Sequence, residues 1–132
     1  MPTLQLKLMP PLAAPVQAAL AAELTQLTAT VLGKRPEVTA VLVEVVPQWF
    51  IGGTSVAQPT AWLAISITAG TNTAEQKAAF VAQAYALLQR HLGSMAPASY
   101  VIVHELPASD WGYGGQTQAM RQAARQREAQ PA

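Results

Sequence analysis

The sequence predicts an α/β (α+β) fold of two pseudo-symmetric βαβ units, which form a four-stranded sheet with two helices on one face. The first observation is a repeat, because Pro2-Thr3 recurs as Pro59-Thr60, 57 residues later. Four further pairs recur at separations of 60 or 62 residues: Leu32-Gly33 with Leu92-Gly93, Pro47 with Pro107, Trp49 with Trp111, and Gly52-Gly53 with Gly114-Gly115. The second observation is that each copy has a helix-like segment between two strand-like segments. Two copies of one unit explain both, so we divide the single domain into a first unit at 1–57, a second at 58–117 and a polar C-terminal tail at 118–132.

The first unit has the order strand, helix, strand. Leucines alternate with polar residues over 3–8, which is typical of a strand with one buried face. A helix is predicted over 15–32, because Pro15 suits a first helical turn and Gly33 suits the position just past the end. Its apolar residues fall on one face: Val16, Leu20, Leu24, Leu27 and Val31. A second strand is predicted over 38–46.

The second unit repeats this order. Segments 61–68 and 99–105 are rich in β-branched residues and are predicted as strands. Between them, Thr73 with Gln76 three residues later forms a capping box at a helix start. The predicted apolar stripe of this helix is Val81, Tyr85, Leu88 and Leu92, before Gly93. A βαβ unit makes its strands parallel and covers one sheet face, so the other face, which is of mixed polarity, is predicted to be a subunit interface that also carries the site.

The composition restricts the function. Only 11% of residues are charged while 51% are hydrophobic, which predicts that part of the surface is buried against other subunits. A formal net charge of +1 makes nucleic-acid binding improbable. The chain has no cysteine and two histidines without clustered carboxylates, so neither thiolate chemistry nor a metal site is expected. We find no signal-peptide pattern and no membrane-spanning run, and expect a soluble, cytoplasmic protein.

Four stretches carry a family resemblance: LGKRP and VVPQWFIGG in the first unit, and ITAGTNTAEQK and WGYGGQ in the second. Together with the duplicated order of elements after an initial Met-Pro, they make residues 2–117 similar to the tautomerase superfamily. The chain resembles fused, two-unit 4-oxalocrotonate tautomerase-like proteins, and its first half is also similar to macrophage migration inhibitory factor. The resemblance implies an isomerase that needs no cofactor and acts on a small carboxylic acid.

The resemblance also implies an N-terminal proline as general base, and only Pro2 can fill that role. Pro59 matches it in sequence, but its nitrogen is an internal amide whose lone pair is delocalised into the carbonyl. Pro2 has a free secondary amine only if Met1 is removed. An α-amino group ordinarily titrates near pH ~8, and a nearby cation or apolar wall lowers that value towards working pH. One unit is therefore expected to be active and the other to be scaffold.

Four substrate-binding residues follow from the same resemblance: Lys34, Thr68, Tyr100 and Trp111. Lys34 would pair with a substrate oxygen, although a solvated cation at a helix end is an alternative interpretation. The Thr68 backbone amide would meet a substrate oxygen. Tyr100 matches a pocket tyrosine or is an interface aromatic. Trp111 and Trp49 occupy equivalent positions, and we prefer Trp111 as the aromatic wall of the site.

The sequence departs from the family pattern in its arginines. The two that bind a dicarboxylate in 4-oxalocrotonate tautomerases have no counterpart, since Ala40 or Tyr100 stands at the strand position. The candidate substitutes are Lys34, Arg35, Arg121 and Arg125. Arginines four apart in a polar tail are also typical of a solvated helix. The segment 118–132 has no apolar stripe, so we expect it to fray.

The most favoured function is tautomerisation of a small keto or enol acid by Pro2, in a homotrimer whose chains together close a barrel. Hydration or dehalogenation of an unsaturated acid is the alternative within enzymes, and a non-catalytic binding or scaffold protein is the alternative outside them. Glu44 and His104 occupy equivalent places in the two units, and an interface pair is favoured there over a proton shuttle.

Overall fold

The computed structural model describes residues 2–130. Its main elements are β1 (Thr3–Met9), α1 (Ala14–Leu32), a short 3₁₀ helix η1 (Pro36–Val38), β2 (Ala40–Val45), β5 (Thr60–Thr68), α2 (Ala74–Leu92) and β6 (Tyr100–Leu106). Two small hairpins follow the units: β3 (Phe50–Ile51) with β4 (Thr54–Ser55), and β7 (Gly112–Tyr113) with β8 (Gln116–Thr117). A third helix, α3 (Gln118–Ala129), ends the described chain.

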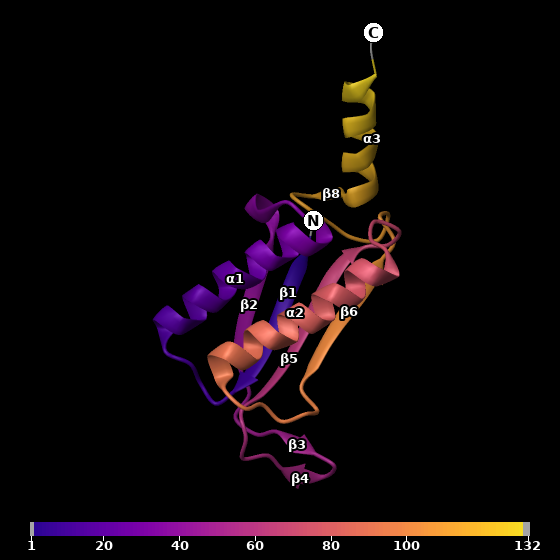
Figure 1. Cartoon of the computed structure of the whole chain (residues 1–132). Coiled ribbons are helices and arrows are strands. Elements are labelled where there is room, and N and C mark those ends of the chain that lie inside the picture. Colours follow the sequence, from indigo (N-terminus) through magenta and orange to yellow (C-terminus); the bar gives the residue numbers. More distant parts are fainter. Residues whose placement is uncertain (1, 131–132) are drawn as a thin grey trace.

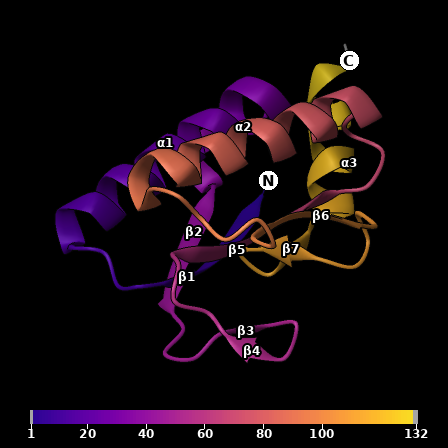
Figure 2. The ribbon, with the colours of Figure 1, turned by 60° about the horizontal axis from the view of Figure 1, so that its bottom comes forward.

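The sheet has the strand order β2-β1-β5-β6. β1 is parallel to β2 and β5 is parallel to β6, whereas β1 and β5 meet antiparallel at the centre with Thr3 opposite Ser66. Both long helices cover the same face of this sheet (Figures 1 and 2). The predicted fold of two βαβ units with two helices on one face is therefore confirmed.

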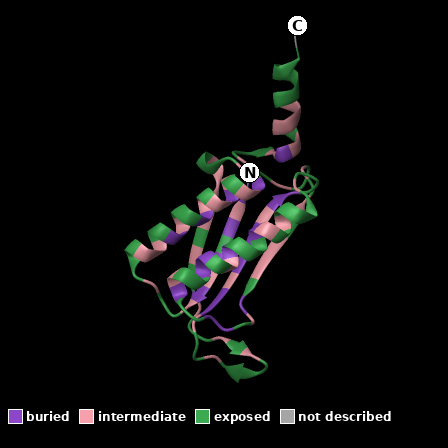
Figure 3. Ribbon diagram, in the orientation of Figure 1, coloured by how far each residue is buried: buried purple, intermediate pink, exposed green. Residues whose placement is uncertain are grey.

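The core lies between the sheet and the two helices (Figure 3). Leu4, Leu6 and Leu8 alternate into it from β1 and are fully buried. On α2 the predicted Leu88 and Leu92 are buried and Tyr85 packs against the core, but Val81 is 37% exposed. Phe80 and Ala84 are buried instead. α2 packs against both the sheet and α1, so its buried sector is broader than a single stripe and is centred one residue earlier.

The helix ends agree with the predictions. α1 is followed by Gly33 with φ +69°, a left-handed conformation that suits glycine, and its amide donates to the Ala29 carbonyl at 3.1 Å. At the start of α2, the Gln76 amide donates to Thr73 Oγ1 at 3.1 Å and the Thr73 amide donates to Gln76 Oε1 at 3.0 Å. The predicted capping box is present.

One predicted boundary shifts in the structure, and one expectation is wrong. The predicted strand 38–46 begins later, because Pro36–Val38 forms η1 and β2 starts at Ala40. The predicted frayed tail is a helix over Gln118–Ala129, capped by Thr117, whose Oγ1 accepts from the Met120 amide at 3.0 Å. α3 projects beyond the sheet, with only its first turns against the rest of the chain (Figure 1). Polar contacts, described below, replace the apolar stripe that the tail lacks.

No helix in the described part of the chain is long and apolar enough to cross a membrane.

Candidate active site

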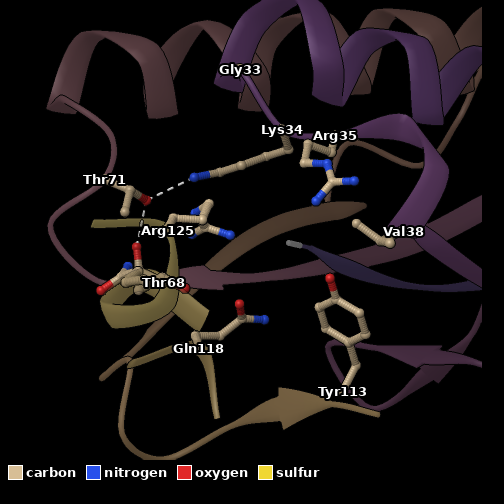
Figure 4. A pocket seen from close by; sticks show the side chains of 10 residues that line it. Gly33, Lys34, Arg35, Val38, Thr68, Thr71, Tyr113, Gln118 and Arg125 are labelled. Carbon is tan, nitrogen blue, oxygen red and sulfur yellow. Dashed lines mark hydrogen bonds between the residues drawn. The ribbon is translucent and has the colours of Figure 1, made fainter. Parts of the chain in front are cut away.

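A pocket of about 250 Å³ lies at the end of the sheet where β1 begins and β5 ends. It is lined by three parts of the chain: the segment after α1, the end of β5 with the following loop, and the second hairpin with α3 (Figure 4). The lining residues are Gly33, Lys34, Arg35, Val38, Thr68, Thr71, Tyr113, Gln118, Gln122 and Arg125. The lining thus contains three cationic side chains and no carboxylate.

The start of β1 lies beside this pocket, although neither Pro2 nor Thr3 is among its lining residues. Pro2 is buried, and its carbonyl accepts a hydrogen bond from the Ala40 amide at 3.3 Å, next to the η1 wall. Because β1 and β5 are antiparallel with Thr3 opposite Ser66, the chain before Thr3 runs towards Thr68. In Figure 4 the indigo strand ends among the labelled side chains.

Lys34 extends across the pocket from the end of α1. Its Nζ donates to Thr71 Oγ1 at 2.7 Å, and that hydroxyl in turn donates to the Thr68 carbonyl at 2.6 Å. Partial burial lowers the pKa of Lys34, and the charge of Glu105 raises it to a smaller extent. The ammonium is thus oriented and partly desolvated, which strengthens its attraction to an anion in the pocket.

The loop that carries Thr71 is held from two sides. Asn72 Nδ2 donates to the Leu32 carbonyl at 2.9 Å, which satisfies an unpaired carbonyl at the end of α1. The Glu105 carboxylate accepts from Lys77 Nζ at 2.6 Å and from the Gly70 amide at 3.4 Å. The hydrogen bond from Lys77, more than that from Gly70, lowers the pKa of Glu105.

The second hairpin supplies the opposite wall. Tyr113 lines the pocket, and Arg121 of α3 stacks on its ring and donates to its carbonyl at 2.9 Å. This hairpin is closed tightly at Gly112, where an added Cβ would meet the Gln116 carbonyl oxygen at 1.8 Å. Any larger residue at Gly112 would therefore force apart the two strands of the hairpin that carries Tyr113.

Comparisons with known proteins agree with this architecture. Residues 62–120 match the family model described as Tautomerase enzyme. The second half of the chain is thus similar to the tautomerase family. The F6 fused 4-OT, a wild-type asymmetric trimer, is 29% identical, with a TM-score of 0.80 over 90% of this chain and 98% of that chain. Native fused 4-OT is 29% identical, with a TM-score of 0.77 over 89% and 97%. The macrophage migration inhibitory factor-like protein of Entamoeba histolytica is 21% identical, with a TM-score of 0.74 over 88% and 97%.

No curated protein matches the chain in sequence. The family model covers the second unit and the first residues of α3, whereas the structural similarity covers both units. The predicted resemblance to a fused 4-OT-like tautomerase is confirmed.

The pocket brings together some of the predicted site residues and not others. Lys34 and Thr68 meet beside the start of β1. Tyr100 lies at the opposite end of the β5–β6 pair, opposite Trp62, and is 60% exposed. Trp111 lines a neighbouring hollow behind the second hairpin. The roles of Tyr100 and Trp111 stay predictions.

Trp49, the equivalent of Trp111, lies in another hollow with Lys7 and Trp62, on the open face of the sheet. Glu44 and His104 are on the two edge strands, β2 and β6, so a contact between them requires two chains. Their interface pairing stays a prediction.

Several lining residues were missed. Tyr113 is the counterpart of Ile51 in the repeat, so the duplication marked its position without indicating a role. α3 contributes Gln118 and Gln122, which were also missed, and Arg125, which the sequence offers as a substitute cation; the three are at helical spacing. Residues at positions i, i+4 and i+7 lie on one helix face, and this polar row was a signal that a search for apolar stripes overlooked.

Proposed function

We propose that this chain is a cofactor-independent tautomerase that interconverts the keto and enol forms of a small carboxylic acid, with Pro2 as general base. One observation carries the proposal, namely that the start of β1 lies beside a cationic pocket lined by Lys34 and Thr68. The matching family model and the fused 4-OT structures support the same chemistry.

The reaction needs one proton carrier and one oxyanion partner. The Pro2 nitrogen removes the proton of the enol hydroxyl, and the oxygen forms a carbonyl as the double-bond electrons move to carbon. That carbon then takes the proton from the prolinium. Lys34, oriented by Thr71, stabilises the negative charge that develops on the oxygen. Neighbouring cations repel a positive charge on the Pro2 nitrogen, so more of Pro2 stays unprotonated and able to act as a base.

This mechanism requires a free amine at Pro2 and therefore removal of Met1. Met1 lies outside the described residues, so its processing stays a prediction. The alternative of hydration or dehalogenation needs an acidic group to activate water. The pocket lining contains no carboxylate, and this favours tautomerisation.

The proposal includes assembly as a homotrimer. β2 and β6 are the edge strands of the sheet, and Leu42 and Tyr100 on its open face are 47% and 60% exposed. Pairing of edges between chains would cover both the edges and the apolar residues. Tyr100 is distant from the pocket of its own chain, so its predicted contact with substrate requires the pocket of a neighbouring chain.

The duplication provides the test. Pro2→Ala keeps an amine but replaces the rigid secondary amine with a flexible primary one, whereas Pro59→Ala changes an internal amide at a strand start. Ketonisation of the enol of phenylpyruvate should fall by roughly 100-fold to 10,000-fold in Pro2→Ala and stay near the parent rate in Pro59→Ala. Equal rates in all three proteins, with unchanged thermal unfolding, would leave the non-catalytic binding protein as the function.

A further inference from the structure

The side chain of Gln118 is the most unusual polar group in the pocket. Gln118 is 4% exposed, and its Nε2 has no hydrogen-bond partner among residues 2–130. An amide donor that stays unpaired in a buried position costs about 1–3 kcal/mol, so such groups usually have a partner. Figure 4 shows the Gln118 amide directed into the pocket, so its unpaired donor faces the space that a bound molecule would occupy.

Arg125 lies two turns further along α3 and lines the same pocket. None of the ion pairs in the described part of the chain includes Arg125, whereas the nearby Arg35 is 3.4 Å from Glu37. Its guanidinium presents donors in a planar fork that matches a carboxylate. Gln118 and Arg125 thus place an amide donor and a free cation on one face of α3.

α3 is fixed in this position by its own contacts. The Gln118 amide donates to the Trp111 carbonyl at 2.9 Å, and the Ala119 amide donates to the Ala108 carbonyl at 2.9 Å. With the Thr117 cap, these bonds satisfy the first amides of the helix. The helix backbone therefore offers no free donors for an anion there, and the side chains of Gln118 and Arg125 have to supply them.

We propose that α3 is the carboxylate-binding element of this site, with Gln118 and Arg125 as specificity-determining residues. The substrate carboxylate lies against Gln118 and Arg125 of α3, while its enol oxygen faces Lys34. The substrate is therefore an acid whose carboxylate and reacting oxygen are separate groups. This assignment explains how a chain without the two expected arginines binds an anion. The assignment of the enol oxygen to Lys34 rests on the proposed function. The binding of a carboxylate by Gln118 and Arg125 does not depend on it.

Binding can be measured without turnover by using benzoylformate, a keto acid that has no hydrogen on the carbon next to its ketone and so cannot enolise. Arg125→Gln should weaken its binding at least about tenfold, because a hydrogen-bonded charge pair is lost. Gln118→Met, which keeps the side-chain length and removes the donor, should also weaken it. The uncharged methyl ester should bind the parent and Arg125→Gln alike.

Arg127→Gln is the matched control. It removes the same charge from the same helix, but Arg127 lines a separate hollow with Met120 and Ala123. It should leave the dissociation constant for benzoylformate within about twofold of the parent, and circular dichroism should show α3 intact in all variants.

Equal weakening by Arg125→Gln and Arg127→Gln would overturn the proposal, as would the absence of saturable benzoylformate binding by the parent chain at millimolar concentration. Failure of the Pro2 hypothesis has a different signature. In that case Pro2→Ala keeps full turnover, while Arg125→Gln still binds benzoylformate more weakly than the parent.

Discussion

The guanidinium carbon of Arg121 lies 3.8 Å from the centroid of the Tyr113 ring, and its Nη2 donates to the Tyr113 carbonyl at 2.9 Å. One side chain thus joins the second hairpin to the first turn of α3. The Tyr113 ring and the polar row of α3 form one wall of the pocket. The position of that wall therefore depends on the contact between Arg121 and Tyr113.

Arg121→Ala should loosen α3 without unfolding the sheet. The loss of the stacked cation and its hydrogen bond removes about 0.5–2 kcal/mol of local stability. Amide hydrogen exchange in residues 122–129 should accelerate correspondingly, while exchange in β1 and β5 should not change. Arg127→Ala is the control, and equal acceleration in both variants would contradict the anchoring role of Arg121.

Met1 should be absent from the mature protein. Pro2 is small enough to allow removal of the initiator methionine, and only the processed chain has a free amine at Pro2. The intact mass should be lower than that of the full sequence by one methionine. Complete retention of Met1 in an active preparation would eliminate Pro2 as the base.

The alkaline limb of the profile of kcat/KM against pH should reflect deprotonation of the Lys34 ammonium. Burial lowers the pKa of Lys34 from its ordinary value of 10.5, so its charge is lost earlier as the pH rises. kcat/KM should decline on the alkaline side below that value. Lys34→Arg retains the charge and should extend the plateau to higher pH, whereas Lys34→Met should be weakly active throughout. An alkaline limb that is identical in Lys34→Arg would assign it to another group.

Acid should weaken the support of the Thr71 loop through Glu105. The folded-state pKa of Glu105 lies below its ordinary value of 4.5, so the folded protein favours the ionised form. The resulting stabilisation is present above that value and is lost as the pH falls through the folded-state pKa. Glu105→Gln should lower the urea midpoint at neutral pH and reduce its acid dependence. Glu128→Gln, which removes the same charge from α3, should leave both unchanged.

Sedimentation should detect a trimer at micromolar concentration. The edge strands β2 and β6 and the exposed Tyr100 need a partner surface, which a neighbouring chain can supply. Leu42→Lys, on the exposed face of an edge strand, should shift the equilibrium towards monomer because it places a charge in the interface. A parent chain that stays monomeric would contradict this assembly.

Much of the architecture could be predicted from the sequence because it follows periodic apolar patterns. Alternating leucines in β1, the capping box of Thr73 and Gln76, and Gly33 after α1 each determine local structure through short-range physics. The error at Val81 concerned only the phase of a stripe, which depends on how α2 packs against its neighbours. The duplication indicated that only Pro2 could have a free amine.

The sequence by itself thus determined the two βαβ units and predicted Pro2, Lys34 and Thr68 as candidate site residues. Only the tertiary structure decided that Tyr113 and α3 complete the pocket. A polar row such as Gln118, Gln122 and Arg125 is equally compatible with a solvated helix, since its members carry no hydrophobic signal. Their function depends on the direction in which the second hairpin, with its close approach at Gly112, leads the chain into α3. That direction results from backbone contacts outside the helix itself.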